Sequence, residues 1–172
     1  MLLNDVFPRA RYGEFKRALC VLDPYNIDLS WEVVETAGTM KSFEIFLNFM
    51  VMDMNMNVLL TDSEKADPKQ LSRMNRFWGD NSWQDIAYRD DPQGNLFEDS
   101  GKIKAEDANA LIADAYRQRL LDIAGFKFAP PPLPFRNSLG RTIYFLFFAS
   151  PDATGNKIVE QIFDKYRDRV WS

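Results

Sequence analysis

The chain has 172 residues, of which 46% are hydrophobic, and its formal net charge is -4. This length and composition predict one globular domain over residues 1–172 with a substantial core. The acidic balance disfavours unassisted, nonspecific binding to duplex nucleic acid, which depends on lysine and arginine side chains that neutralise phosphates. It leaves room for a local basic groove, so nucleic acid stays open as a partner.

The sequence contains no histidine and a single cysteine, Cys20. The absence of histidine excludes Ser–His triads, histidine general bases and zinc sites of the usual Cys/His type. Cys20 lies in an apolar run, where a thiol behaves as a small buried hydrophobe, and no disulfide can form within the chain. No apolar run reaches bilayer length and no signal-like segment is found, so we expect a soluble cytoplasmic protein without a membrane partner.

The first predicted unit is a strand, a helix and a second strand. Residues Ala18–Leu22 are short and apolar and are followed by Pro24, as is typical of a strand within a sheet. Ser30 can cap a helix that ends near Gly38, and Phe43–Phe49 forms a second buried strand. Because a helical crossover joins neighbouring parallel strands, we expect these two strands to be parallel.

Residues 51–102 are predicted to form a helical insertion. The run "MVMDMNMNVLL" shows both strand-like alternation and a helical stripe, and we interpret it as a helix whose methionines fill the core. A short helix is expected from Ser82, and residues 91–102, which are polar and contain glycine, are expected to form an exposed loop.

Within the insertion, "DPKQLSRMNRFWG" carries a helix signature. Asp67 is placed to cap the helix, Pro68 takes the first helical position and Gln70 is placed to reach back to the cap. Gly79 is expected to end the helix.

The C-terminal third begins with a long predicted helix over residues 104–125, followed by a strand over 126–129. The prolines of "PPPLPF" cannot donate ladder hydrogen bonds, so this segment is expected at a sheet edge or outside the sheet. "RNSLGR" predicts a hairpin turn before an apolar strand over 142–150.

A last helix is predicted over residues 154–169. Its apolar positions fall on one face, which we expect to cover the sheet. These positions are Ile158, Val159, Ile162, Phe163 and Tyr166.

These elements predict an α/β protein: a partial Rossmann-like sheet with two parallel strands, an antiparallel edge hairpin and a helical insertion. The order resembles the C-terminal half of class I S-adenosylmethionine-dependent methyltransferases. The segments "LDPYNIDLSWEVVETAG", "KSFEIFLNFMVMDMNMNVLL", "RMNRFWGDNSW", "YRQRLLDIAGFKFAPPPLPFRN" and "YFLFFASPDATGNKIVEQIF" cover nearly the whole chain and are similar to the three-Cys-motif partner protein family, TcmP.

The resemblance implies a methyltransferase-like Rossmann protein of prokaryotes. Its implied partner is a three-cysteine-motif protein, which is itself similar to radical-SAM-like iron-sulfur proteins. No reaction is established for the family, so whether the chain is an enzyme stays open. Longer members carry a stretch like "YIDGFAGPG" after their first strand, and this sequence begins shortly before the expected fourth strand. We therefore expect a truncated chain that does not bind S-adenosylmethionine alone, but that could do so with the missing half supplied.

Candidate site residues follow the first two strands. Asp23, Tyr25 and Asn26 come after the first strand, and Asn48 lies near the end of the second, where open α/β sheets bind ligands. In amino-methyltransferases a similar polar residue accepts the hydrogens of the target amino group and an aromatic ring stacks on the extruded base. The resemblance thus implies Asp23 and Tyr25 as catalytic candidates and Asn26 and Asn48 as substrate-binding candidates. Alternatively, Asp23 caps the following turn and Tyr25 covers the sheet end.

Three further groups could bind a ligand. Arg136 and Asn137 lie at the hairpin turn, where the arginine could contact a phosphate. Trp78, Trp83 and Tyr88 could form a stacking platform for bases, or a small core beneath the long loop. A third polar set, Asp53, Asn55 and Asn57, follows Asn48, although asparagines in such positions more often solvate a helix or cap a turn.

The strand over residues 17–24 would have an unpaired edge without an upstream half. Such an edge is a template for association, so we expect a homodimer or a complex with a complementary N-terminal half, unless the N-terminal segment folds back over it. Two functional classes remain: the substrate-side half of a split methyltransferase acting on nucleic acid, and a noncatalytic interaction module. A truncated product without a role is a third alternative.

Overall fold

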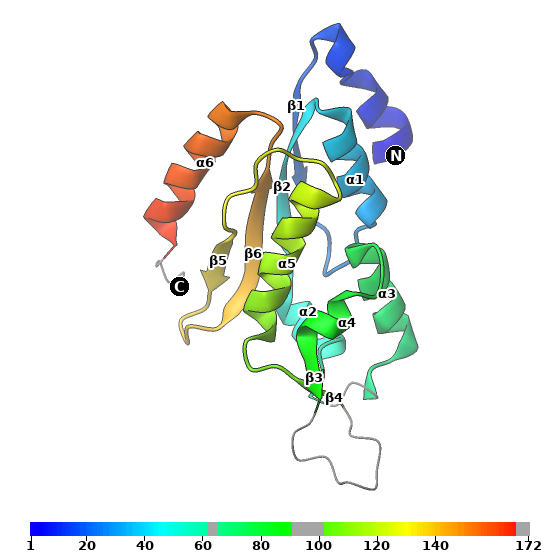
Figure 1. Ribbon diagram of the computed structural model, residues 1–172, viewed down its shortest axis with the longest axis vertical. Coiled ribbons are helices and arrows are strands. Elements are labelled where there is room, and N and C mark those ends of the chain that lie inside the picture. Colours follow the sequence, from blue (N-terminus) through cyan, green and yellow to red (C-terminus); the bar gives the residue numbers. More distant parts are fainter. Residues whose placement is uncertain (62–64, 91–101, 168–172) are drawn as a thin grey trace, which may run out of the picture.

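A four-stranded mixed sheet organises the chain, in the strand order β1-β2-β6-β5 (Figure 1). The computed structural model describes residues 1–61, 65–90 and 102–167. The strands are β1 (Ala18–Leu22), β2 (Phe43–Phe49), β5 (Leu133–Arg136) and β6 (Thr142–Ala149). β1 and β2 are parallel, and the other two pairings are antiparallel. The predicted bounds of the first two strands, their parallel pairing and the edge hairpin are confirmed.

The central strand β2 separates the two faces of the sheet by strict alternation. Phe43, Ile45, Leu47 and Phe49 are buried, whereas the residues between them are half-buried. Side chains of successive strand residues point to opposite faces, so the buried set lines one face. That face is the one on which the main core is built.

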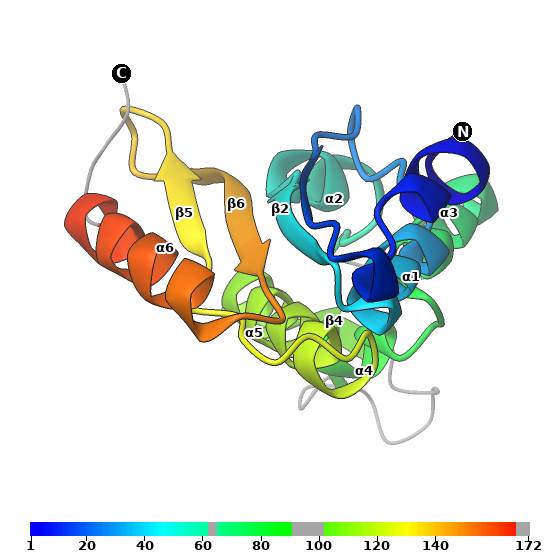
Figure 2. The ribbon, with the colours of Figure 1, turned by 90° about the horizontal axis from the view of Figure 1, so that it is seen from above.

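The helices cover the two faces unequally. α1 (Trp31–Met40) and α5 (Ala108–Asp122) contribute to the main core, while α6 (Ala153–Tyr166) lies on the opposite side of β6 from α5 (Figures 1 and 2). α6 packs Val159 and Phe163 into a small second cluster with Leu133 and Phe148. One face is therefore thickly covered and the other thinly.

The insertion is not purely helical, which corrects the expectation for residues 51–102. It contains α2 (Val51–Asn57), α3 (Pro68–Trp78) and α4 (Trp83–Ala87), as expected, but also a small antiparallel pair formed by β3 (Tyr88–Asp90) and β4 (Lys102–Lys104). Lys102 thus belongs to a strand rather than to the predicted loop, and residues 91–101 of that loop lie outside the described residues. Three-residue strands are too short to leave a periodic pattern in the sequence.

The predicted signature of α3 is confirmed at both ends. The side chain of Asp67 accepts a hydrogen bond from the backbone N–H of Lys69 at 2.8 Å, and Gly79 ends the helix with φ +103°. The expected return contact of Gln70 is not made, because its buried Oε1 atom has no hydrogen-bond partner among the described residues. The cap therefore rests on the aspartate alone.

Two predicted helix boundaries are wrong. α1 continues through Gly38 to Met40 and ends where Lys41 adopts a left-handed conformation. Gly38 instead allows close packing, because a Cβ atom there would overlap the carbonyl oxygen of Ala124. α5 begins at Ala108 rather than at residue 104, which is part of β4.

The C-terminal third requires two more corrections. Residues 126–129 form no strand; only an isolated bridge joins Phe128 to Ser150. On α6, Val159 and Phe163 are buried as predicted, whereas Ile158 and Ile162 are 54% and 47% exposed. Their expected role in covering the sheet is therefore wrong. The predicted end of this helix, at residue 169, lies outside the described residues.

The main core is rich in aromatic rings. Tyr116 lies at its centre, stacked on Phe77 with 5.2 Å between ring centroids and in edge contact with Trp31 and Phe147. Trp78, Trp83 and Tyr88 are buried in this main core rather than in a small separate one, so their burial is confirmed and they are not free to stack on bases. Aromatic rings bring large apolar areas into a core, which explains how a modest sheet supports this fold.

The N-terminal segment forms three short helical turns, Leu2–Val6, Phe7–Arg9 and Tyr12–Glu14. Its anchor is Phe7, which is buried against Phe43 with 4.5 Å between ring centroids. The segment thus docks at the start of β2, on the covered face of the sheet.

Candidate functional site

Four of the six predicted site residues line one cavity, of about 380 Å³, at the carboxyl ends of β1 and β2. They are Asp23, Tyr25, Asn26 and Asn48; the cavity is completed by Pro24, Met50, Ile143 and Tyr144. Strand ends and an adjacent turn converge here because β1 and β2 run in the same direction.

Asp23 and Asn48 form the polar centre of this cavity. Leu22 pairs with Leu47 in the β1–β2 register, which brings the next residue of each strand side by side. The Nδ2 atom of Asn48 donates a hydrogen bond to Oδ1 of Asp23 at 2.8 Å. Oδ1 of Asn48 is buried and has no hydrogen-bond partner among the described residues. The pair therefore contains the exposed carboxylate of Asp23 and a buried amide oxygen of Asn48 that lacks a donor in the part of the chain that the structure describes.

Two tyrosines flank this pair, in different ways. Tyr25 is 87% exposed, and its position beside Asn26, which has a left-handed φ of 60°, places it on the turn after β1. Tyr144 reaches the cavity from β6, and its ring stacks on Phe135 at 4.5 Å. Burial and the nearby charge of Asp23 raise the pKa of Tyr144, so its hydroxyl stays protonated as a donor.

Arg136 and Asn137 do not reach this cavity. Arg136 donates from NH1 to the carbonyl of Arg167 at 3.2 Å. Oδ1 of Asn137 accepts from the backbone N–H groups of Leu139 and Arg141, which shapes the hairpin turn. Asn137 and Arg141 line a separate cavity beside α2. Their sequence position at a turn gave no information on this separation.

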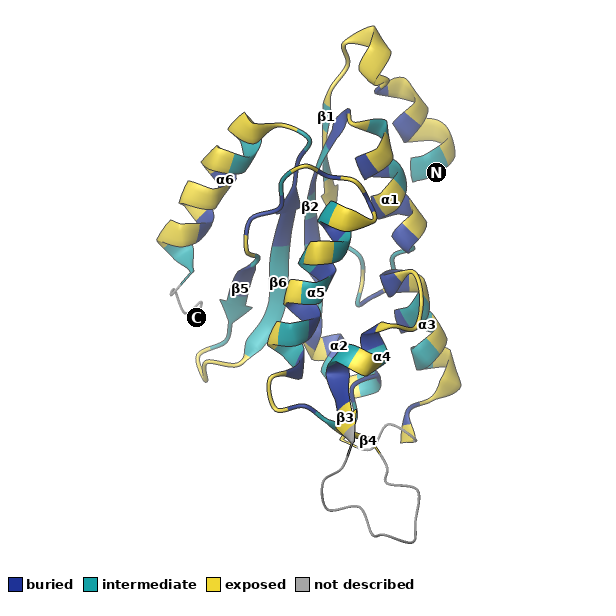
Figure 3. Ribbon diagram, viewed as in Figure 1, coloured by how far each residue is buried: buried dark blue, intermediate teal, exposed yellow. Residues whose placement is uncertain are grey.

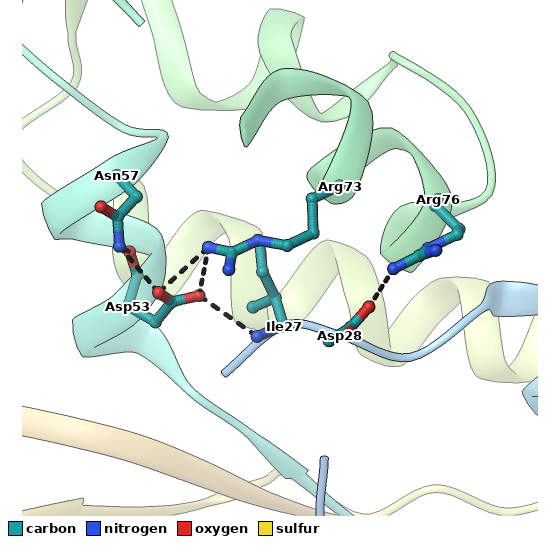
Figure 4. A network of polar contacts seen from close by, with 6 residues as sticks. All are labelled: Ile27, Asp28, Asp53, Asn57, Arg73 and Arg76. Atoms are coloured by element: carbon teal, nitrogen blue, oxygen red, sulfur yellow. Dashed lines mark hydrogen bonds and ion pairs between the residues drawn. The ribbon is translucent and has the colours of Figure 1, made fainter. Parts of the chain in front are cut away.

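Sequence reasoning missed the partner of Asp53. Asp53 is 7% exposed and receives the NH2 group of Arg73 at 2.8 and 3.0 Å (Figure 4). It also accepts from the backbone N–H of Ile27 at 3.2 Å and from Asn57 at 2.7 Å. The helical spacing of Asp53 and Asn57 was visible in the sequence, but α3 as the source of the arginine was not.

The Asp53 network is structural and supports the candidate site. By holding the N–H of Ile27, it fixes the segment that leads away from Tyr25 and Asn26. A charge so buried is retained only when it is paired and hydrogen-bonded, as Asp53 is. Beside it, an exposed ion pair joins Arg76 to Asp28 (Figure 4).

Asn55 serves another contact. Its Oδ1 accepts from Nζ of Lys104 at 2.6 Å, and Lys104 also donates to the carbonyl of Leu59 at 3.1 Å. Burial lowers the pKa of this lysine. Asn55 thus ties α2 to β4, whereas Asn57 bonds to Asp53 within α2. Neither residue lines the Asp23 cavity.

The cavity offers hydrogen-bond acceptors, one phenolic donor and an exposed ring, a set suited to a planar group that carries amino hydrogens. In the described ranges, no cluster of three or more Cys, Asp or Glu side chains could hold a metal ion, and no helix there has the length and apolar character needed to cross a bilayer. No model of a protein family matches the chain, and no curated protein or solved structure matches it significantly.

Proposed function

We propose that this chain is a three-Cys-motif partner-like protein whose cavity at the ends of β1 and β2 binds a planar, amino-bearing group such as a nucleobase. The observation that carries the proposal is the Asp23–Asn48 pair, with Tyr25 exposed at its rim. In this arrangement Asp23 and Asn48 accept the amino hydrogens, and Tyr25 stacks on the ring. The position corresponds to the substrate side of a methyltransferase-like fold.

The order of the elements supports the proposal. A parallel pair, β1 and β2, is followed by helices and then by an antiparallel pair, β6 and β5, at the other edge of the sheet. The C-terminal half of a class I methyltransferase has the same succession. Because fold alone does not determine function, the proposal depends on the residues of the cavity.

The turns after β1 and β2 support our expectation that this chain does not bind S-adenosylmethionine alone. A Rossmann-type cofactor site needs a glycine-rich turn after a strand, so that backbone can approach the ligand. The turn that follows β1 is Asp23–Pro24–Tyr25–Asn26, and β2 is followed by Met50; neither contains glycine. We therefore assign no methyl transfer to this chain, and its proposed role is recognition.

Titration calorimetry with nucleotides tests this role. Adenosine and cytidine monophosphates carry exocyclic amino groups, whereas uridine monophosphate does not, so the first two should bind more tightly. One hydrogen bond to a charged acceptor contributes about 1.5–3 kcal/mol, which corresponds to roughly 10- to 150-fold in affinity. Equal binding of all three nucleotides, or none, would remove the proposal.

Variants at two residues, Tyr25 and Asp23, assign the contacts. Tyr25→Ala should weaken binding by about 1–3 kcal/mol through lost stacking, while Tyr25→Phe should retain it. Asp23→Ala should abolish the preference for amino-bearing bases. Phe15→Ala, at a ring that is 91% exposed outside the cavity, and Asp85→Ala, at a carboxylate that is 79% exposed, are the matched controls.

The same titration with S-adenosylmethionine and S-adenosylhomocysteine examines the cofactor. We expect no binding to this chain alone, and binding after addition of the N-terminal half of a longer family member if the protein acts as one part of a split methyltransferase. Binding to the chain alone would instead make Asp23 a catalytic candidate.

The second candidate is a noncatalytic interaction module that binds the three-cysteine-motif protein. The observation that favours it is the apolar surface left open at β1, where Leu19 and Val21 are 56% and 69% exposed. Titration of the purified three-cysteine-motif protein separates the two candidates: Leu19→Ser should abolish that complex and leave nucleotide binding unchanged.

A further inference from the structure

The outer edge of β1 presents free backbone groups. The N–H of Ala18 donates to the carbonyl of Ser42 at 2.9 Å, and Ala18 pairs with Phe43. In a parallel ladder the bonding direction alternates along the strand, so Ala18, Cys20 and Leu22 bond toward β2. The N–H and C=O groups of Leu19 and Val21 therefore point away from it. Among the described residues, β2 is the only strand that pairs with β1.

The side chains next to this edge are apolar and exposed. Leu19 and Val21 are 56% and 69% exposed; they pair with Glu44 and Phe46, so they lie on the α6 face of the sheet, at the edge farthest from β5. Figure 3 shows exposed residues in β1. The N-terminal segment does not shield them, since Phe7 docks against Phe43 on the opposite face. A strand edge that is both unpaired and apolar readily accepts another strand.

The sequence of the edge indicates what that other strand is. Residues 17–23 read Arg-Ala-Leu-Cys-Val-Leu-Asp, and positions equally distant from Cys20 are complementary. In an antiparallel pair of two copies centred on Cys20, Leu19 lies opposite Val21 of the second copy, and Arg17 lies opposite Asp23. Both contacts occur twice because of the twofold symmetry.

Other registers of the same edge are less favourable. Only residues whose backbone points outward can form the bonded pairs, so the axis must pass through a residue, and the nearest alternatives to Cys20 are Leu19 and Val21. An axis at Leu19 sets Arg17 against Val21, and an axis at Val21 sets Leu19 against Asp23. Each places a charge opposite an apolar side chain and loses the ion pair.

We propose that two copies of this chain associate through antiparallel pairing of β1 across a twofold axis at Cys20, which joins their sheets into one. Arg17 and Asp23 are both exposed and can form this contact. Arg17 now lies over the ring of Tyr12, 4.0 Å from its centroid, and Asp23 keeps its bond to Asn48. The dimer brings Arg17 of the second copy to the rim of the Asp23 cavity. This inference does not depend on the proposed function.

Charge exchange tests the register. Sedimentation equilibrium should show a dimer for the unaltered chain. Arg17→Asp places two carboxylates opposite each other at both ends of the interface and should weaken dimerisation on the order of tenfold or more, as should Asp23→Arg. The double variant should restore the dimer. Arg141→Asp, in the hairpin turn, is the matched control, and circular dichroism verifies that each variant is folded.

Cys20 provides an independent readout. In the proposed register the two Cys20 residues form a non-hydrogen-bonded pair with Cα atoms about 4.5 Å apart, which a disulfide can bridge. With diamide, two thiols lose two electrons and two protons to the oxidant and form one disulfide. Diamide should therefore give a covalent dimer of the unaltered chain, and much less for Arg17→Asp.

Three results would overturn the proposal. The first is a monomer at high micromolar concentration. The second is a dimer that is insensitive to Arg17→Asp and forms no Cys20 disulfide. The third is a chain that stays monomeric alone but forms a one-to-one complex with the N-terminal half of a longer family member, since that half would then be the occupant of the edge.

Discussion

The two faces of the sheet differ in how they are covered, and this difference separates stability from recognition. On the face of α1 and α5, rings such as Phe49 and Phe147 are fully buried around Tyr116. On the face of α6, a small cluster covers β5 and β6 while Leu19 and Val21 stay exposed. The thick side supplies most of the apolar burial, so the thin side is free to carry contacts with other molecules.

The largest expected effect compares one phenylalanine from each face. Phe147→Ala on the thick side should lower the free energy of unfolding by about 3–5 kcal/mol, because the surrounding rings cannot collapse into the void. Phe163→Ala on α6 should cost at least about 1 kcal/mol less, because the void left by this ring lies in the small cluster and can relax toward solvent. Urea denaturation followed by fluorescence measures both. Equal losses would contradict the asymmetry between the faces.

Two arginines of α3 compare a buried ion pair with an exposed one. Arg73→Ala leaves the carboxylate of Asp53 buried without its ion pair, and should cost about 2–4 kcal/mol, somewhat below the usual loss for a broken buried pair because Ile27 and Asn57 still donate. Arg76→Ala removes an exposed pair with Asp28 and should cost about 0–1 kcal/mol. Similar costs for the two variants would show that Asp53 is better solvated than its 7% exposure suggests.

A smaller effect is expected from two glycines, one on each side. Gly38→Ala drives a methyl group into the carbonyl of Ala124, a backbone obstacle, and should cost about 1–3 kcal/mol. Gly155→Ala on α6 meets the carboxylate of Glu44, a side chain that can move, and should cost less than about 1 kcal/mol. Thermal unfolding of the two variants compares them directly; a larger loss for Gly155→Ala would mean that Glu44 is held more firmly than the backbone at Ala124.

The smallest effect is a shift in tyrosine ionisation. Burial raises the pKa values of Tyr116 and Tyr144, and the charge of Asp23 adds to the shift at Tyr144. A raised folded-state pKa gives stability that is fully present below the unfolded value of about 10 and is lost as the pH rises through the folded value. Asp23→Asn should lower the pKa of Tyr144 toward the ordinary value, as followed by ultraviolet titration. An unchanged titration would show that the charge of Asp23 does not contribute to the raised pKa of Tyr144.

The sequence predicts much of the sheet, because its strands are apolar runs bounded by turn residues. Residues 18–22 and 43–49 match β1 and β2, and the crossover helix predicts their parallel direction correctly. The same relation places Asp23 beside Asn48, so the polar centre of the candidate site follows from strand order alone.

The remainder depends on contacts between distant segments. No local pattern predicts that Arg73 reaches Asp53, or that Arg136 is held by the carbonyl of Arg167 rather than lining the cavity. Ile158 and Ile162 fit a core-facing helical stripe, yet their exposure depends on where α6 crosses the sheet. Helical periodicity gives a face but not its partner.

The position of β6 also has a consequence for how the chain reaches this structure. β6 pairs with the central strand β2, and the hydroxyl of Ser150 donates to Glu44, a residue 106 positions earlier, at 2.7 Å. Closing so long a loop costs entropy before any of its contacts form, and topologies dominated by such pairings fold slowly. During synthesis β2 therefore cannot pair with β6 until the C-terminal third of the chain has been made. Until then the apolar residues of β2 are exposed, and they can bind chaperones or aggregate.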